Sequence, residues 1–486
     1  MKRIIIFLLS LIGANIAFAQ NVDDAYLYSQ VFYQGTAKSL GMGNAMGAVG
    51  GDMTAVCINP ASMGIYRSDE ITTTLNMLDN YNASTYYGTV NGANRMRVSI
   101  PNIGFVHSKQ RSNYKALRFT QFGFGLTRTN DYNQRTNARG INPTSSKIDN
   151  YLSQIDSLSP YDLTNLYPYD IGPAWNTYLI DTCKDDLGLY YGSPVPQGNI
   201  WQGQENLFKG RSEEWNFAGS LNFFDKLFIG INVSLDHIKR SGTRKFTETR
   251  VEGTETDFNE WSFEETLSST GWGCNGKIGL IYHATPWLRL GAAFHSPTQY
   301  SFDESWQTQT TSEISHVTFN SFSPESHYEY YFTSPLKWIG STAFVIKQQG
   351  MVSIDAEYTN YGAARFKAVA NDDYDYGPKN DSIKSILGRT LNLRIGSEWQ
   401  VGNTYLRMGV GYYGSPLGLG QSNGSVKKAS LGVSWPLGSA TTIDFAYELS
   451  YGQTYFRLYD AGVLGIEPVT QKQFKNNFAA TIKMRF

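Results

Sequence analysis

Long apolar runs, cysteine and excess charge are all scarce in this chain of 486 residues. After the first twenty residues, no apolar run reaches the roughly 18 residues that a membrane-spanning helix requires, which excludes a helical membrane protein. Lys and Arg total 41 and Asp and Glu total 42, so the net charge at pH 7 is −1. Because nucleic-acid binding requires a basic surface, this balance gives no support for a nucleic-acid partner.

Residues with metal-binding or catalytic chemistry form no recognisable pattern. The three cysteines, Cys57, Cys183 and Cys274, are odd in number and scattered, which argues against a disulfide framework but leaves one pair open. The six histidines include no pair at a metal-binding spacing such as i, i+4, and no Ser, His and Asp stand apart as a catalytic set. We therefore predict no metal site, no cofactor and no enzyme activity.

Aromatic residues, in contrast, are abundant: Tyr, Phe and Trp number 32, 27 and 10. The mean hydropathy is nevertheless negative, at −0.34. A β-barrel in a membrane combines these properties, because one half of each strand faces water and its loops are polar. The composition therefore favours a transmembrane barrel.

The N-terminus has the features of a secretory signal. Lys2 and Arg3 precede the apolar stretch 4–11, and Ala17-Phe18-Ala19 forms a small-x-small cleavage site. We predict a cleaved signal peptide at residues 1–19 and an exported chain that begins near Gln20.

The stretch 35–67 is rich in Gly, Ala and Met, contains almost no charge and keeps neither a helical nor a strand period. Irregular backbone of this kind is stable only where partners surround its N–H and C=O groups. We predict that residues 20–67 form a buried plug, on the periplasmic side, inside a wall made by residues 68–486.

Period-2 alternation marks fourteen candidate strands after residue 68. In the last of them Phe478, Ala480 and Ile482 share one face, while Asn477 and Thr481 share the other. The candidates cover about 69–79, 97–108, 115–128, 213–223, 227–238, 272–283, 287–297, 335–347, 350–361, 389–400, 404–413, 425–436, 440–451 and 474–486.

Short gaps between these segments alternate with long ones, the longest running from about 129 to 212. Transmembrane barrels show this asymmetry, with tight periplasmic turns and long outer loops. The chain ends on Phe486 on the apolar face, as outer-membrane barrels commonly do. The predicted fold is thus all-β: a monomeric, 14-stranded antiparallel outer-membrane barrel of a Gram-negative cell, surrounded by lipid and delivered to the barrel-assembly machinery through Phe486.

The plug segment with Asn59-Pro60-Ala61, followed by a barrel of this layout, resembles the long-chain fatty acid transporter family of the FadL/TodX type. The stretches LNLRIGSEW, LRMGVGYYGSP and SIDAEYTNYG are similar to a branch whose members are described as hemin receptors. The resemblance implies a barrel closed by an N-terminal hatch that carries Asn59, Pro60 and Ala61. It also implies passive passage of hydrophobic molecules, such as fatty acids or aromatic compounds, through hatch movement and a lateral opening.

Several residues are candidates for ligand contact or for the gate. Met42, Met46, Met53 and Met63 have flexible thioethers suited to apolar ligands, although packing of the plug against the wall is the favoured alternative. Pro101 interrupts the second strand, and because proline cannot donate to a ladder, we place the lateral opening there.

Charged residues on the polar strand faces point into the expected lumen. We favour a structural role in which they pair across the lumen; the alternative makes Arg394 or Arg407 an anchor for a substrate carboxylate. The principal candidates are Arg289, Arg394, Glu398 and Arg407.

Two other functions remain open from the sequence. The barrel is alternatively a binding platform, for example a protein-secretion partner, with large outer loops near 129–212 and 302–334 rich in Tyr and Trp. His316 or His327, in an expected outer loop, is the only residue-level support for haem binding, and a solvated loop histidine is the favoured interpretation.

Overall fold

The computed structural model describes residues 21–111, 116–155, 158–185, 188–254, 256–347, 349–370, 372–418, 423–459 and 466–486. The predicted signal peptide, residues 1–19, lies outside the described residues. Within them, no helix has the length and apolar character needed to cross a membrane.

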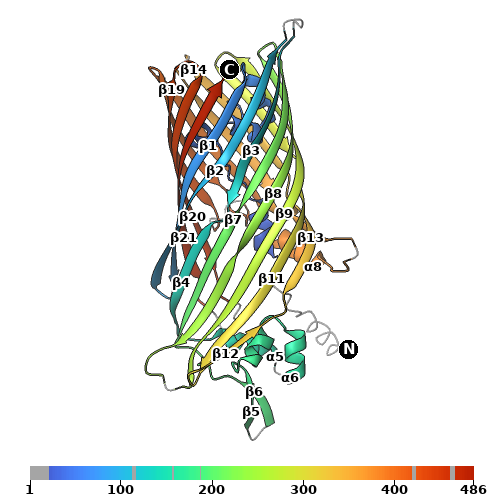
Figure 1. Cartoon of the computed structure of the whole chain (residues 1–486), viewed down its shortest axis with the longest axis vertical. Helices are drawn as coiled ribbons and strands as arrows, with labels where there is room; N and C mark the ends of the chain where they lie inside the picture. The colour runs from blue at the N-terminus through green and yellow to red at the C-terminus, as the bar shows by residue number, and fades with distance from the viewer. Residues whose placement is uncertain are drawn as a thin grey trace.

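The described residues form a closed antiparallel barrel of 14 wall strands, as predicted (Figure 1). The wall closes where the first strand, β1, pairs with the last, β21, from Glu70↔Arg485 to Thr85↔Thr470. Four wall strands are each interrupted and carry two labels: β3/β4, β10/β11, β14/β13 and β15/β16. The bounds are β1 Glu70–Tyr86, β2 Thr89–Gln110, β3 Leu117–Asp131, β4 Gln134–Asn142, β7 Ile200–Phe223, β8 Leu227–Arg250, β9 Phe258–Thr285, β10 Leu288–His295, β11 Gln299–Ile314, β13 Ser326–Thr333, β14 Lys337–Ile346, β15 Gly350–Asn360, β16 Arg365–Ala368, β17 Arg389–Val401, β18 Thr404–Tyr413, β19 Val426–Leu437, β20 Thr441–Phe456 and β21 Val469–Arg485.

The two ends of the barrel differ. Short connections join β7 to β8, β9 to β10, β17 to β18 and β19 to β20 at the end where the C-terminus lies, at the top of Figure 1. We call this the turn end and the opposite one the loop end. Phe486 lies at the turn end with an exposed side chain, and its amide donates to the carbonyl of Asp69 at 3.2 Å. Its recognition by the assembly machinery stays a prediction.

Several strands run further toward the loop end than the alternation indicated. β7, β8 and β9 extend well past the segments 213–223, 227–238 and 272–283, and β11, β12 (Val317–Phe322) and β13 occupy most of the expected loop 302–334. The cause is an inversion of the pattern. On β11, Phe302 and Trp306 face inward while Asp303 and Ser305 face outward, which is the reverse of the turn-end half.

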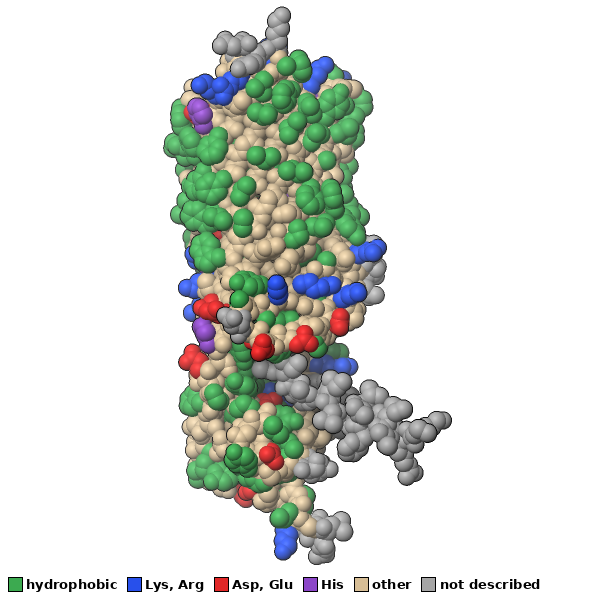
Figure 2. Space-filling model, turned by 90° about the vertical axis from the view of Figure 1, so that its right-hand side faces the viewer, with side chains coloured by type: hydrophobic (Ala, Val, Ile, Leu, Met, Phe, Trp, Pro, Cys, Tyr) green, Lys and Arg blue, Asp and Glu red, His purple; other side chains and the backbone are tan. Residues whose placement is uncertain are grey.

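Exposed apolar side chains occur on strands all around the turn-end half of the wall, and on the face shown in Figure 2 they form a belt with a row of charged side chains beneath it. Exposed aromatic side chains mark the belt's edges on β9, where Trp272 and Tyr282 are ten residues apart. At ~3.3 Å per residue and a tilt of about 40°, that separation spans roughly 25 Å across a membrane.

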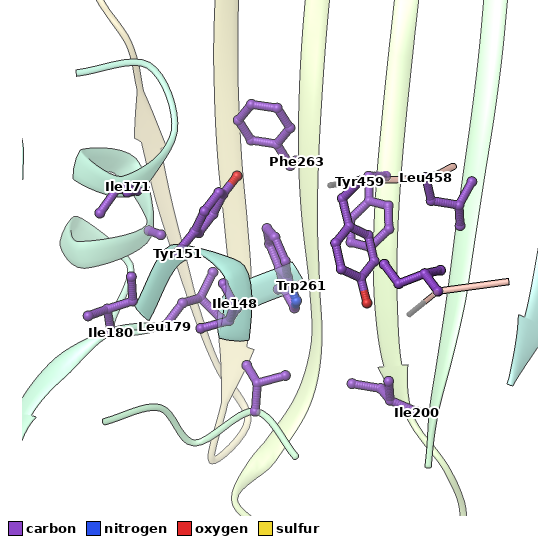
Figure 3. Close-up of a cluster of buried hydrophobic side chains, with 14 of the residues drawn as sticks. Ile148, Tyr151, Ile171, Leu179, Ile180, Ile200, Trp261, Phe263, Leu458 and Tyr459 are labelled. Atoms are coloured by element: carbon purple, nitrogen blue, oxygen red, sulfur yellow. The ribbon is translucent and has the colours of Figure 1, made fainter. Parts of the chain in front are cut away.

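A helical cap fills the loop-end mouth. Inside the span 129–212 lie β4, the helices α5 (Lys147–Ile155), α6 (Pro160–Leu166) and α7 (Ile171–Asn176), the hairpin β5 (Asp181–Asp185) and β6 (Gly188–Gly192), and the start of β7. Figure 3 shows Ile148 and Tyr151 of α5 packed toward Trp261 of β9. The buried carboxylate of Glu248 ties the cap to the wall, because it accepts hydrogen bonds from Ser146 Oγ and Trp261 Nε1, both at 2.6 Å.

Candidate functional site

Residues 21–66, which we call the N-terminal segment, lie inside the barrel. They contain the helices α2 (Val22–Ser29), α3 (Ala37–Gly41) and α4 (Met53–Ile58) and the 3-10 helix η1 (Pro60–Ile65). Nearly every side chain from Tyr33 to Gly64 is buried. The short helices contact several wall strands: α3 lies against β18 to β21, and η1 against β7 to β9. The wall therefore supplies the partners that this irregular backbone requires.

The Asn59-Pro60-Ala61 turn is fixed by both the segment and the wall. The Asn59 side chain caps η1, since its Oδ1 accepts from the Ala61 amide at 3.1 Å. Its Nδ2 donates to the Gly47 carbonyl at 2.7 Å and to the Leu280 carbonyl of β9 at 3.2 Å. The motif thus connects two parts of the segment to the wall.

A pair of wall glycines makes room for this turn. Gly230 of β8 and Gly279 of β9 are directly paired in the ladder. A Cβ on Gly230 would overlap Pro60 and Ala61, and one on Gly279 would overlap Asn59. Gly396 and Gly409, also paired across their strands, make room in the same way for Met42 and Gly43. The inner wall is therefore shaped to the segment's backbone.

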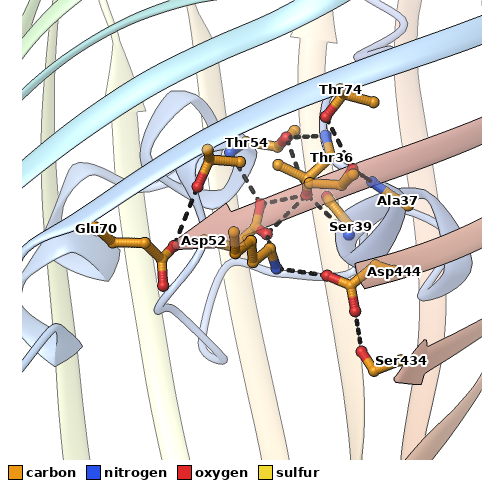
Figure 4. A network of polar contacts seen from close by, with 12 residues as sticks. Thr36, Ala37, Ser39, Asp52, Thr54, Glu70, Thr74, Ser434 and Asp444 are labelled. Carbon is orange, nitrogen blue, oxygen red and sulfur yellow. Dashed lines mark hydrogen bonds and ion pairs between the residues drawn. The ribbon is translucent and has the colours of Figure 1, made fainter. Parts of the chain in front are cut away.

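A buried ion network joins the segment to β20 and β21 (Figure 4). Lys483 Nζ lies 3.2 Å from Asp52 of the segment and 2.9 Å from Asp444 of the wall. Asp52 also accepts from Thr36 Oγ1 at 2.7 Å and from the Thr54 amide at 2.9 Å. Asp52 is fully buried, so losing the lysine would leave an uncompensated charge inside the barrel.

Two of the predicted lumen arginines, Arg394 and Arg407, are buried and paired. Arg407 reaches Glu398 at 2.6 Å and Asp444 at 3.1 Å, which extends the Lys483 network. Arg394 is only 1% exposed on its side chain and lies 2.9 Å from Glu357. These contacts fit the structural role, and the carboxylate-anchor alternative stays a prediction.

Arg394 also lies near Asp355, whose Oδ2 accepts the Gly47 amide of the segment at 3.0 Å. Arg289 has a different position: its Nη1 donates to the Val49 carbonyl at 3.3 Å. Both therefore contribute to holding the 47–49 stretch, Arg394 through Asp355 and Arg289 directly.

Two further wall residues hold the segment and were not predicted from the sequence. Lys277 pairs with Glu214 and donates to the Cys57 carbonyl at 3.1 Å, and His295 Nε2 lies 2.9 Å from the Ile58 carbonyl. Both side chains are on the inward faces of their strands. The alternation of inward and outward residues could therefore have identified them as candidates. Their partners are backbone carbonyls, which a sequence does not reveal.

All four predicted methionines are fully buried in contacts between segment and wall. Met42 and Met46 pack in one apolar cluster with Ile339 and Ala343, while Met53 and Met63 pack with Val106 and Ala218 in another. This arrangement fits the packing alternative. Ligand contact by the methionines stays a prediction.

Pro101 lies at an irregular point of the wall. Between Thr74↔Asn102 and Asn76↔Ser99, two residues of β2 oppose the single Leu75 of β1, which is a β-bulge. On its other side, β2 pairs with β3 from Gln110 only as far as Asn102↔Thr127. In the described residues, 89–101 have no ladder partner on that side.

In the described part of the chain, side-chain contacts bridge this unpaired line, which we call the β2–β4 seam. Arg128 Nη1 donates to Ser99 Oγ at 2.6 Å, and Asn91 Nδ2 donates to the Arg139 carbonyl at 3.0 Å. Beyond Arg128 the third wall strand bends inward, because Asn80 of β1 reaches the carbonyl of Asn133 at 3.0 Å. Along the seam, side-chain contacts therefore take the place of a backbone ladder.

An aromatic cluster occupies the lumen beside α2, toward the loop end. Tyr28 stacks on Phe302 with ring centroids 4.6 Å apart, and Phe302 stacks on Tyr330 at 5.3 Å. A small polar cavity of about 50 Å³ lies next to it, bordered by Asp24, Arg240 and Glu304. Asp24 and Arg240 are paired at 3.0 Å, which fixes α2 to β8.

The cysteines and loop histidines have simple positions. Cys57, Cys183 and Cys274 are all free thiols. His316 lies in the turn between β11 and β12, whereas His327 lies on the outer face of β13 rather than in a loop.

The sequence matches no protein-family model and no curated protein. Among solved structures, a Pseudomonas aeruginosa FadL homologue has a TM-score of 0.58 at 12% identity, covering 94% of this chain and 99% of that chain. The Pseudomonas putida toluene transporter TodX has a TM-score of 0.53 at 14% identity (94% and 100% covered), and the Ralstonia pickettii toluene transporter TbuX 0.52 at 15% (95% and 100%). The predicted resemblance is confirmed at the level of the fold: this chain has the barrel fold of FadL/TodX-type proteins.

Proposed function

We propose that this protein is an outer-membrane channel for hydrophobic small molecules and that the N-terminal segment closes it at rest. The observation that carries the proposal is the burial of residues 33–64 inside a barrel with an apolar outer belt. The segment acts as a hatch, and the contacts of Asn59-Pro60-Ala61 and the Lys483 network hold it against the wall. The barrel functions without an enzymatic step.

The orientation follows from the belt and the connections. An apolar band of roughly 25 Å fits the hydrocarbon thickness that a transmembrane barrel presents to lipid. The turn end then faces the periplasm and the capped loop end faces outward. This placement requires export by the signal predicted at residues 1–19.

The solute class follows from the closed lumen. A hydrophobic molecule gains free energy on leaving water for an apolar environment, so it requires no open aqueous pore. The aromatic cluster around Phe302 offers ring faces of the kind that apolar ligands contact. Two of the structural neighbours are toluene transporters, which agrees with this class. Fatty acids and aromatic compounds both belong to it.

The exit that we propose is the β2–β4 seam at Pro101. Along continuous ladders, such as β7 with β8 and β8 with β9, a solute would have to break backbone hydrogen bonds to leave the lumen sideways. At the seam it has to displace only side-chain contacts such as Arg128 to Ser99. An apolar solute would thus enter the bilayer directly, without energy coupling.

Mass spectrometry of small molecules carried through purification in mild detergent tests the proposal. The intact barrel and a variant lacking residues 21–66 are purified in parallel. We expect fatty acids or aromatic compounds enriched with the intact protein only. Enrichment of haem alone would support a haem receptor instead, and empty barrels in both samples would contradict a hydrophobic-compound channel.

One observation favours a second candidate, a binding platform. The cap exposes large apolar side chains away from the belt, including Tyr161, Leu166 and Leu189 at 77%, 62% and 75% exposure. Such exposed groups are typical of protein interaction surfaces. This function predicts a stoichiometric protein partner after crosslinking in mild detergent, and repeated isolation of the barrel alone would count against it.

A further inference from the structure

Three side chains with metal-ligand chemistry meet on the outer face of the wall, away from the lumen. Asp303 on β11 and Glu329 on β13 are direct cross-strand partners, and His327 lies two residues before Glu329 on the same face. Ligand atoms of the three side chains all lie within 4.8 Å of one another. His327 Nε2 is 3.5 Å from Asp303 Oδ1.

Apart from His327, no cationic side chain compensates the two carboxylates within ion-pair distance in the described residues. Like charges directly opposite on neighbouring strands are destabilising. In the part of the chain that the structure describes, neither Asp303 nor Glu329 forms an ion pair with a lysine or arginine. A cation bound between the two carboxylates would relieve their repulsion, and the neutral imidazole of His327 would supply a third ligand.

We propose that Asp303, His327 and Glu329 bind a divalent metal ion of the zinc class. One imidazole nitrogen and two carboxylate oxygens form a set that suits Zn²⁺, whereas Ca²⁺ and Mg²⁺ prefer oxygen ligands alone. Tetrahedral Zn²⁺ places neighbouring ligand atoms about 3.3 Å apart, so the present spacing requires only a small closure. The His327 and Asp303 side chains are 62% and 61% exposed and therefore free to adjust.

The site also has a defined level on the barrel. Ser301, two residues before Asp303, pairs with Trp272 on one side and Tyr331 on the other. These aromatic side chains are exposed at the edge of the apolar belt. The metal therefore lies just outside the belt and links β11 to β13 across their ladder, with its open side facing away from the wall.

Metal binding to the purified full-length barrel in detergent tests this inference. The protein is treated with a chelator and dialysed against graded Zn²⁺ or Ca²⁺, and bound metal is counted by atomic emission. We expect one Zn²⁺ per chain, with affinity at least tenfold weaker in His327→Ala and in Asp303→Asn. His316→Ala is the matched control, because His316 is an exposed histidine that lies near one carboxylate, Glu313, at 3.8 Å. It should bind as the unaltered protein does.

A gain-of-function variant separates the site from any folding defect. Asp303→His creates a two-histidine, one-glutamate set, which is common for zinc, and should bind Zn²⁺ more tightly than the unaltered protein. Absence of stoichiometric zinc, equal zinc binding in His327→Ala, or Ca²⁺ binding that does not depend on His327 would each overturn the proposal.

Discussion

Gly230 and Gly279 face each other across β8 and β9, and the Asn-Pro-Ala turn of the N-terminal segment occupies the space above both. A side chain at either position would displace the turn. This relationship makes the segment part of the wall's packing and leads to a direct test of how it is seated.

We expect Gly279→Val to unseat the N-terminal segment, because its Cβ would overlap the Asn59 side chain. The measurable result is an ion conductance in planar bilayers that the unaltered protein lacks. Gly276→Val on the same strand is the matched control, since nothing lies within 4 Å of a Cβ there. Equal conductance in the two variants would contradict the role of the glycine pair.

Replacing Lys483 with methionine should weaken the barrel. The change leaves Asp52 and Asp444 buried with less compensation, and breaking a buried pair of this kind typically costs about 3–5 kcal/mol. Urea unfolding of the refolded protein measures the loss. Arg135→Ala, which removes the exposed pair with Glu205, should cost less than about 1 kcal/mol. Similar losses of unfolding free energy in both variants would show that the Lys483 network does not hold the segment in place.

Pro101→Val should hinder passage at the seam. The valine restores a backbone N–H and removes one cause of the bulge, so β2 can lie straighter and approach the third wall strand more closely along the seam. We expect slower uptake of a hydrophobic probe into cells or vesicles, with the closed-state conductance unchanged. Pro335→Val, at a strand break on another side of the barrel, is the comparison variant. Uptake unaffected by Pro101→Val, or reduced equally by both changes, would place the exit elsewhere.

The cap should show a pH dependence that originates in Glu248. Burial raises the pKa of this carboxyl, and the hydrogen bonds that it accepts lower it only in part. A raised pKa contributes stability that is fully present below the unfolded value, about 4.5, and that is lost as pH rises through the folded value. Fluorescence-monitored unfolding near Trp261 should therefore show a more stable cap near pH 4.5 than near pH 8. Glu248→Gln should remove that difference; its persistence would assign it to another group.

The strand count followed from the sequence because short turns and apolar alternation survive on every strand inside the belt. The strand lengths could not be predicted in the same way, because beyond the belt the apolar residues move from the outward to the inward face of the strands. There Phe302 and Trp306 turn inward, Asp303 and Ser305 turn outward, and the pattern resembles a polar loop. The expected loop 302–334 is therefore mostly strand.

The candidate site was predictable in outline only. Alternation placed Arg394, Glu398 and Arg407 inside correctly, yet their partners depend on strand register. A search for metal ligands at a short spacing such as i, i+4 could not find the proposed zinc site. Asp303 and His327 are 24 positions apart in the chain and meet only across a ladder. The role of wall glycines such as Gly279 could not be predicted, because it depends on which backbone segment packs against them.

The most direct test of the central claim is the conductance of the barrel lacking residues 21–66, compared with the intact protein in sealed planar bilayers. Our account predicts a silent intact protein and a stable open pore after the deletion, with the folded barrel verified by circular dichroism. A folded deletion variant that adds no conductance would show that the N-terminal segment does not close the lumen.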